Sequence, residues 1–193
     1  MDQLLAAIER RAIGRDAPLI VALDGRSGTG KSTLAARLAV MVNAVVITCD
    51  DFYSGSTDAA WLARTPQQRA ACCIDWRRLR REVVEPLRAG QRARYHPFDF
   101  AKGSGLARHT ITHDPRPIVI LDGAYSGRPE LADIVDIAAL LELSDGVRRG
   151  RLIAREGPAF MAAWHPVWDA AEDHYFTNIC PPSRYDFVLT VAA

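Results

Sequence analysis

The sequence predicts a single α/β domain built on a parallel sheet. Two patterns support this: short apolar runs alternate with longer stretches of helical periodicity, and a glycine-rich loop directly follows the first run. Nearly continuous apolar runs are typical of strands buried on both faces, and their alternation with helices indicates right-handed crossovers. The sequence has 193 residues, and 49% of them are hydrophobic. This length and composition predict one domain, residues 1–193, with a buried core.

Five apolar runs are candidate strands. They are residues 19–24, 45–49, 117–121, 136–143 and 186–191. Helical periodicity lies between them, in residues 31–42, 75–89, 145–156 and 165–178. Pro86 falls inside the second of these helices, and because proline lacks a backbone N–H we expect the helix to kink or restart there.

Two segments break the alternation. Residues 53–70 contain glycine, serine and proline, and predict a loop that leads into a short helix. Residues 91–116 contain two short alternating stretches around Gly-Ser-Gly at 103–105, which predict a β-hairpin outside the main sheet. We place this hairpin at residues 93–113.

Composition narrows the class of protein. The formal net charge is +1, so the overall charge gives no reason to expect a nucleic-acid or membrane-surface partner. The four cysteines form no C-x-x-C pair, which favours thiols in a reducing compartment over a zinc site or a disulfide framework. No secretory signal pattern or 18-residue apolar run occurs, so we expect a cytoplasmic protein.

The glycine-rich loop carries the clearest functional signal. Residues 25–32, GRSGTGKS, match G-x-x-x-x-G-K-[ST] in full, between the first predicted strand and the first predicted helix. Glycines allow successive N–H groups to converge on one anion, and a helix N-terminus favours phosphate. We expect Lys31 to reach the β- and γ-phosphates and Ser32 to hold magnesium. The predicted nucleotide-binding residues are Gly25, Ser27, Gly28, Thr29, Gly30, Lys31, Ser32 and Thr33.

Carboxylates stand at the ends of two further predicted strands. Asp122 ends the run PIVILD and predicts a metal-side carboxylate, although Asp-Gly is also a common turn pair. Asp50 and Asp51 follow the second strand, at the sheet edge where ligands bind in open α/β folds. A carboxylate at Asp50 is placed to accept the proton of a hydroxyl that attacks a γ-phosphate. The alternative is a cap at a strand end.

Arginines cluster on the predicted helix 145–156. They are Arg148, Arg149, Arg151 and Arg155. Arg151 and Arg155 are four residues apart and share one helix face, so we expect them to reach one phosphoryl group together. A solvated basic face is the alternative for some of the four.

Aromatic residues gather in two places. Tyr95, Phe98 and Phe100 lie in the predicted hairpin, where they either line a flat ring or pack onto the domain. Trp164, Trp168 and Tyr175 follow roughly helical spacing, which favours core packing.

Taken together, these stretches resemble the uridine kinase and phosphoribulokinase group of P-loop kinases, above all its bacterial uridine kinase-like proteins. The resemblance runs over most of the chain and is carried by DGRSGTGKSTLA, DDFY, DWRRLRREVVEPLRAG, YHPFDF, ILDGAYSGRPELAD, RRGRLIAREG and EDHYF…YDFVLT. It implies a P-loop NTPase three-layer sandwich. The parallel sheet would have five strands in the order 2-3-1-4-5, with a small hairpin over the acceptor and a short arginine-rich lid at residues 145–158.

The resemblance also implies an ATP- and Mg²⁺-dependent kinase that phosphorylates a hydroxyl of a small molecule. It gives Asp50 the role of catalytic carboxylate and Lys31, Arg151 and Arg155 the role of stabilising charge. Ser32 and Asp122 correspond to the magnesium-side groups. The acceptor-side residues that we expect are Tyr53, Asp75, Tyr95 and Phe98.

The acceptor itself stays open. Nucleoside kinases of this group carry a histidine shortly after the Tyr-Asp-Phe stretch, whereas residues 98–100 are followed here by Ala-Lys-Gly. The resemblance favours the 5′-hydroxyl of a pyrimidine nucleoside, and a sugar, a sugar phosphate or a pantothenate-like molecule is the alternative. A nucleotide-hydrolysing switch is a third reading, which the acceptor-side residues disfavour. No N/T-K-x-D stretch occurs, so we expect ATP rather than GTP; the sequence leaves the oligomeric state open.

Overall fold

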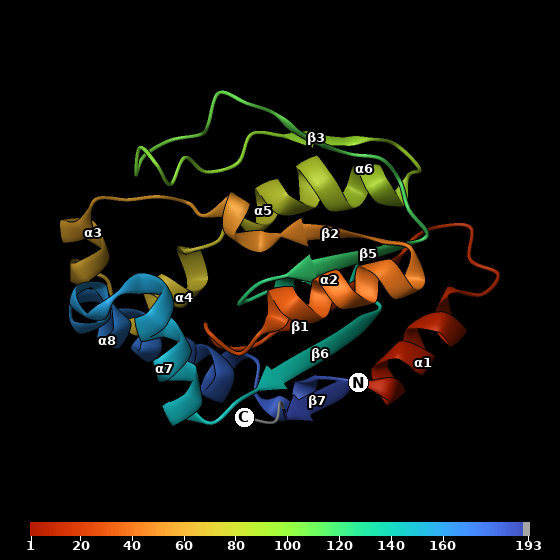
Figure 1. The fold of residues 1–193 in the computed structure, drawn as a ribbon. Helices are drawn as coiled ribbons and strands as arrows, with labels where there is room; N and C mark the ends of the chain where they lie inside the picture. The colour runs from red at the N-terminus through yellow and green to blue at the C-terminus, as the bar shows by residue number, and fades with distance from the viewer. Residues whose placement is uncertain (191–193) are drawn as a thin grey trace.

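Five parallel strands form the central sheet of the computed structural model, which describes residues 1–190 (Figure 1). They are β1 (Leu19–Asp24), β2 (Ala44–Thr48), β5 (Ile118–Asp122), β6 (Ile137–Glu142) and β7 (Phe187–Thr190). Their order across the sheet is β2-β5-β1-β6-β7, which is 2-3-1-4-5 when these strands are counted along the chain. The expected α/β class and strand order are therefore confirmed. Position 191, the predicted end of the last strand, lies outside the described residues.

Helices cover both faces of this sheet. On one face α1 (Asp2–Ala12) and α2 (Lys31–Val42) bury Leu4, Ile8 and Leu38 against strand residues such as Val21. Each such fully buried aliphatic side chain contributes about 2 kcal/mol of hydrophobic stabilisation. Ile20, the neighbour of Val21, points to the opposite face, because successive strand residues alternate.

The opposite face is covered by segments that come from several crossovers. They are α3 (Asp58–Ala63), α4 (Pro66–Cys72), α5 (Trp76–Leu79), α6 (Glu85–Arg88) and α8 (Pro158–His174) together with short 3₁₀ turns at Cys49–Phe52, Pro129–Leu131 and Pro182–Arg184. Helix α7 (Asp145–Glu156) packs on the phosphate loop instead. In Figure 1, α3, α7 and α8 lie beyond the carboxyl ends of the strands, where the phosphate loop also lies. This edge of the sheet therefore carries the candidate site.

The predicted helices at 31–42 and 145–156 have the predicted bounds. The helix expected at 75–89 is divided as Pro86 predicts: α5 widens into a π turn at Arg80–Val84, and α6 then begins just before the proline. The helix expected to begin at 165 begins instead at Pro158, with proline in its favoured first position. It ends in a second π turn, at Tyr175–Ile179.

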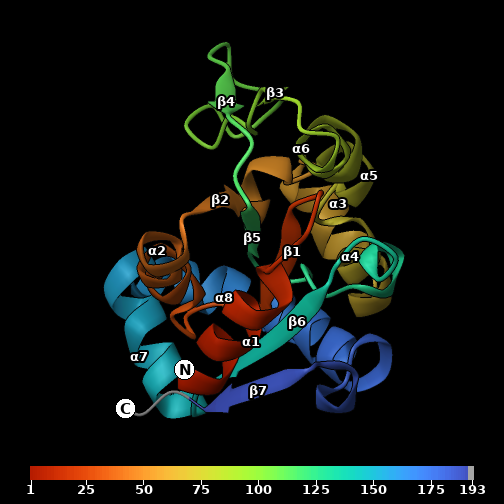
Figure 2. The ribbon, with the colours of Figure 1, turned by 90° about the vertical axis from the view of Figure 1, so that its right-hand side faces the viewer.

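Residues 53–70 hold the expected loop and then two short helices, α3 and α4, rather than one. The expected hairpin is present: β3 (Ala93–Tyr95) pairs with β4 (Ile111–His113) in antiparallel register, outside the main sheet. Figure 2 shows it projecting beyond β2 and α6. Within residues 1–190, no helix has the length and apolar character needed to span a membrane.

Candidate active site

The phosphate loop joins β1 to α2 through a backbone that only glycine adopts easily. Gly25 has φ of 144°, and a Cβ there would lie 2.5 Å from the carbonyl oxygen of Leu141. Lys31 is buried, and its ammonium donates to the carbonyls of Gly25 at 2.8 Å and Arg26 at 2.9 Å. The cation predicted to meet phosphate is thus held within the loop. Thr29 is also buried, whereas Ser32 and Thr33 are exposed in the first turn of α2.

Asp24, at the end of β1, organises the surroundings of the loop, and the sequence analysis did not single it out. Its side chain is fully buried and accepts two hydrogen bonds on Oδ1 and three on Oδ2. The donors are the N–H groups of Gly25, Tyr125 and Gly127 and the hydroxyls of Tyr175 and Tyr185. Burial raises the pKa of Asp24, and these hydrogen bonds and Lys31 partly offset the effect. A signal was present: LIVALDG in β1 repeats the apolar-Asp-Gly pattern of VILDG in β5.

Asp122 lies at the same edge, because its register partners are Leu23 of β1 and Thr48 of β2. It is 5% exposed, and its Oδ1 has no hydrogen-bond partner among the described residues. Burial raises the pKa of Asp122, while the neighbouring Ser32 hydroxyl and the charge of Lys31 act in the opposite direction.

The side chains of Asp122 and Ser32 fit a magnesium ion. Mg²⁺ takes oxygen ligands, usually one or two carboxylates together with phosphate and water. The unpartnered Oδ1 of Asp122 and the hydroxyl of Ser32 are oxygen donors of this kind. Within residues 1–190 no group of three or more His, Cys, Asp or Glu side chains suits a metal ion, so nucleotide and water would supply the remaining ligands.

Asp50 and Asp51 point to different surroundings, although they are adjacent in the 3₁₀ turn after β2. Asp50 is exposed to solvent and lies in the wall of a cavity. Loss of solvation raises the pKa of Asp50, the charge of Asp122 adds to the effect, and Lys31 and Arg155 oppose it. Asp51 instead accepts a hydrogen bond from the Tyr95 hydroxyl at 2.8 Å.

The cavity beside Asp50 has a volume of about 560 Å³ and largely aromatic walls. Its aromatic lining residues are Tyr53, Trp61, Phe98, Phe100, Phe160, Trp164 and Trp168 together with Tyr125. The Tyr53 and Phe98 rings meet edge to face at 4.9 Å. Trp164 and Trp168 pack against the core, as the sequence indicated, but they also form part of the cavity wall.

Two expected acceptor-side residues lie away from this lining. Asp75 caps helix α5, where its Oδ1 accepts from the Arg78 N–H at 3.0 Å. The ring of Tyr95 is buried 4.7 Å from that of Phe52, and its hydroxyl bonds Asp51. Neither side chain lines the cavity. Their contribution would be to hold in place the segments that carry the lining residues.

Arg78 connects that framework and was not singled out in the sequence. Its guanidinium is buried 4.5 Å above the Phe52 ring. It donates to the carbonyls of His96 at 2.8 Å and Asp51 at 2.9 Å. The hairpin is thereby fastened to the segment that carries Asp50.

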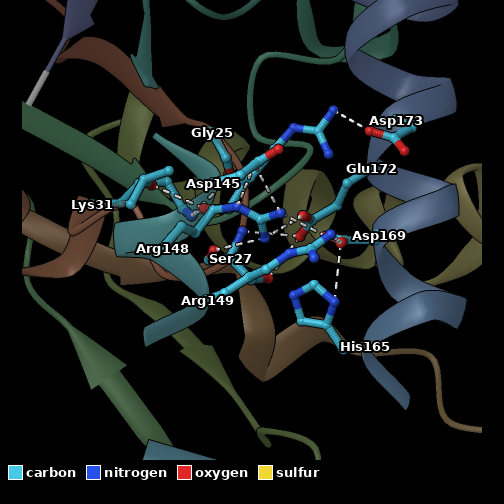
Figure 3. Close-up of polar contacts among 12 residues, drawn as sticks. Gly25, Ser27, Lys31, Asp145, Arg148, Arg149, His165, Asp169, Glu172 and Asp173 are labelled. Carbon is cyan, nitrogen blue, oxygen red and sulfur yellow. Dashed lines mark hydrogen bonds and ion pairs between the residues drawn. The ribbon is translucent and has the colours of Figure 1, made fainter. Parts of the chain in front are cut away.

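The four arginines of α7 have different surroundings. Arg148 is 1% exposed and binds Asp169 of α8 at 2.8 Å (Figure 3), whereas Arg149 is largely exposed. Arg151 reaches the phosphate loop, since a Cβ at Gly30 would lie 3.4 Å from its Nη1. Arg155 lines the cavity and binds Glu156.

A second cavity, of about 810 Å³, lies on the other side of the loop. It is bounded by Arg26 and Thr29 of the loop, by residues 140–145 at the end of β6 and just after it, and by Pro181 and Pro182. The phosphate loop therefore separates two cavities, one aromatic and one between the ends of β6 and β7.

Comparisons with known proteins agree on a nucleotide-binding fold. A protein-family model described as RNA helicase matches residues 21–98, which include the phosphate loop. Uridine-cytidine kinase A of Dictyostelium discoideum is 26% identical over 179 residues, which are 89% of this chain. The chain spans about a third of the length of that relative, 34%.

Solved structures extend the comparison to the whole fold. One described as a possible uridine kinase from Bacillus stearothermophilus has a TM-score of 0.66 at 20% identity, over 97% of this chain and 96% of that one. A candidate fructose transport system kinase from Silicibacter sp. TM1040 has a TM-score of 0.64 at 22% identity, over 96% and 98% of the two chains. The chain thus has the fold of the P-loop kinases and, among them, resembles the uridine kinase and phosphoribulokinase group that its motifs indicated.

Proposed function

We propose that the protein is an ATP-dependent kinase that transfers the γ-phosphoryl group to a hydroxyl of a neutral small molecule. One observation carries the proposal: Ser27 of the phosphate loop and the carboxylate of Asp50 line the same aromatic cavity. Donor loop, candidate base and ring-binding walls therefore meet in one space. A protein that only hydrolyses nucleotide would have no need of such a cavity.

The residues suggest a division of roles. Asp50 orients the acceptor hydroxyl and takes its proton, a task that is mostly positioning in phosphoryl transfer. Lys31, Arg151 and Arg155 stabilise the negative charge that develops on the transferred group. Ser32 and Asp122 would hold Mg²⁺, which neutralises charge on the phosphate oxygens when bound.

The nucleoside part of ATP would occupy the cavity of about 810 Å³. This cavity adjoins the loop on the side away from Asp50, with Arg26 and Thr29 of the loop in its wall. ATP placed there would direct its γ-phosphate past the loop toward the aromatic cavity.

The aromatic cavity favours a flat, uncharged acceptor. Its charged lining residues are Asp50, Asp58, Arg155, Glu156 and Glu172. Four of these are acidic, so an acceptor that carries phosphate or carboxylate would meet repulsion. Aromatic walls favour a planar ring or an apolar sugar face. We therefore favour the 5′-hydroxyl of a pyrimidine nucleoside, with a neutral sugar as the alternative, over a sugar phosphate or a pantothenate-like molecule.

A test is ADP formation with ATP, Mg²⁺ and a panel of nucleosides, sugars, sugar phosphates and pantothenate. We expect acceptor-dependent turnover with a neutral acceptor, and a loss of at least about 100-fold in Asp50→Asn. Asp16→Asn, on an exposed loop, is the matched control and should retain full turnover. ADP formation that no acceptor accelerates would instead indicate a hydrolysing switch.

A further inference from the structure

The backbone of Ser27 is held from two sides by the helices that follow β6. From α8, Glu172 Oε1 accepts hydrogen bonds from the Ser27 N–H at 3.0 Å and from its hydroxyl at 2.7 Å (Figure 3). From α7, Arg148 Nη1 donates to the Ser27 carbonyl at 3.3 Å. At the next position, a Cβ on Gly28 would lie 3.0 Å from Leu152 Cγ, so α7 packs directly on the loop. Both helices thus contact one short segment of the phosphate loop.

Glu172 and Arg148 also face each other in the interior. They are 3% and 1% exposed, and Arg148 Nη1 lies 3.8 Å from Glu172 Oε2. Burial of two charges costs several kcal/mol, and the mutual attraction repays this only with good geometry and full hydrogen bonding. Glu172 Oε2 has no hydrogen-bond partner in the part of the chain that the structure describes. Arg148 has a closer partner in Asp169, at 2.8 Å, so its contact with Glu172 is poorly explained as a device for stability alone.

The position of the pair indicates another role. Ser27 and Glu172 both line the aromatic cavity, which the candidate base Asp50 also lines. The helix that carries Arg148 also carries Arg151 and Arg155 on its following turns. The buried pair consequently links the donor loop to the helix whose arginines we assign to the transferred phosphoryl group.

We propose that Glu172 and Arg148 are positioning residues that fix the phosphate loop to the arginine-bearing helix α7. The inference rests on the proposed kinase function and deepens it. With the link intact, loop and arginines keep one arrangement around the phosphoryl group and exclude water from it. Without the link, the arginines lose register with the loop, transfer slows, and water competes with the acceptor for the phosphoryl group.

The test is Glu172→Gln, assayed for phosphorylated acceptor and for total ADP in the same reaction. Glutamine keeps an acceptor for Ser27 but removes the charge opposite Arg148. We expect kcat for transfer to fall about 10-fold or more, because small misplacements at a site have effects of this order. The ratio of hydrolysis to transfer should rise several-fold, which a purely structural role would not produce. Arg148→Met should have the same effect, and the double variant should be no worse than either single one, as for residues that act as a unit.

Ile153→Ala is the control, because Ile153 lies on the same helix and is 48% exposed. It should leave both products unchanged. If Glu172→Gln fails to fold, Glu172→Asp keeps the charge but shortens the reach to Ser27, and it should raise the same ratio. Folded variants with an unchanged ratio, or with additive losses in the double variant, would overturn the inference while the kinase proposal stands. Absence of acceptor-dependent transfer in the wild type would overturn the kinase proposal, and this inference with it.

Discussion

The carboxylate of Asp24 and the hydroxyl of Tyr185 share a 2.8 Å hydrogen bond, although the two residues are 161 positions apart. On its other oxygen Asp24 holds the N–H of Gly25, the first residue of the phosphate loop. One buried side chain therefore joins the donor loop to the segment that leads into the last strand. The link gives Asp24 a larger role in stability than its position in β1 alone would indicate.

Asp24→Asn should be strongly destabilising. An amide places an NH₂ group against backbone and hydroxyl donors, and a buried network that loses its acceptor typically costs about 3 kcal/mol or more. Urea unfolding followed by circular dichroism measures the change. Tyr185→Phe, which removes one donor, should cost only about 1 kcal/mol. Equal losses in the two variants would contradict a central role for Asp24.

The pH dependence of turnover should reveal Asp50. Its pKa lies above the ordinary value of 3.8, chiefly because the surrounding protein removes solvation, and a base must be ionised to act. Acceptor turnover should therefore fall as pH decreases through this raised pKa, and the fall should be absent from the residual rate of Asp50→Asn.

The same raised pKa has a consequence for stability. A carboxyl whose pKa is higher in the folded state stabilises the fold below pH 3.8 and loses that contribution as pH rises through the folded pKa. Asp50→Asn, which cannot ionise, should therefore unfold at the same or higher urea concentration than the wild type at pH 7. A clear loss of stability at that pH would contradict the assigned shift.

Asp122→Asn should weaken magnesium dependence more than nucleotide affinity. The Oδ1 of Asp122 lacks a partner within residues 1–190, and a neutral amide is a poorer ligand for Mg²⁺ than a carboxylate. We expect the Mg²⁺ concentration for half-maximal turnover to rise about 10-fold or more, a typical effect of altering a metal site. Titration of turnover with MgCl₂ at saturating ATP measures this, and an unchanged midpoint would remove Asp122 from the metal site.

Arg78→Lys should loosen the hairpin from the Asp50 segment. Lysine cannot reproduce a planar guanidinium that donates to two carbonyls and stacks on Phe52. Loss of about 1.4 kcal/mol from this anchorage would raise KM for the acceptor about 10-fold, with KM for ATP unchanged. Arg77→Lys, at the exposed neighbouring position, is the control. A parallel rise in both KM values would show a general loss of structure instead.

Two glycines should respond in opposite ways to alanine. At Gly25 a Cβ would meet a backbone oxygen at 2.5 Å, so Gly25→Ala should abolish nucleotide binding. Gly150, inside α7, has open space around the same atom, and Gly150→Ala should stabilise the protein by about 0.5–1 kcal/mol. Thermal unfolding with and without ATP measures both effects, and destabilisation by Gly150→Ala would contradict the second.

Local patterns were enough to predict the strands, the helices at 31–42 and 145–156 and the phosphate loop. Strand burial and helical periodicity extend over a few residues, and the loop motif is contiguous, so these features are visible in the sequence itself. The strand order was predicted from the resemblance to the P-loop kinases. The neighbouring carboxyl ends of β1, β2 and β5 follow from that order.

Long-range polar partners could not be predicted in this way. Glu172 binds Ser27 across 145 positions, and nothing near either residue indicates the other. Arg78 is buried and the adjacent Arg77 is exposed, but both lie in the same arginine-rich helix. Nothing in the local sequence distinguishes one from the other. Helical spacing placed Trp168 in a core, but only the packing of α8 against α3 and α4 shows that this face also borders a cavity.

The anchorage of the hairpin by main-chain atoms has a consequence for changes to its side chains. Arg78 binds carbonyls rather than side chains, and the Phe98 N–H donates to the carbonyl of Asp51 at 2.8 Å. These attachments therefore do not depend on the side chains of residues 97–110, whereas the His96 ring bonds the carbonyls of Ala107 and His109. The segment is a suitable region for directed libraries that test the proposed acceptor preference while the phosphate loop is left untouched.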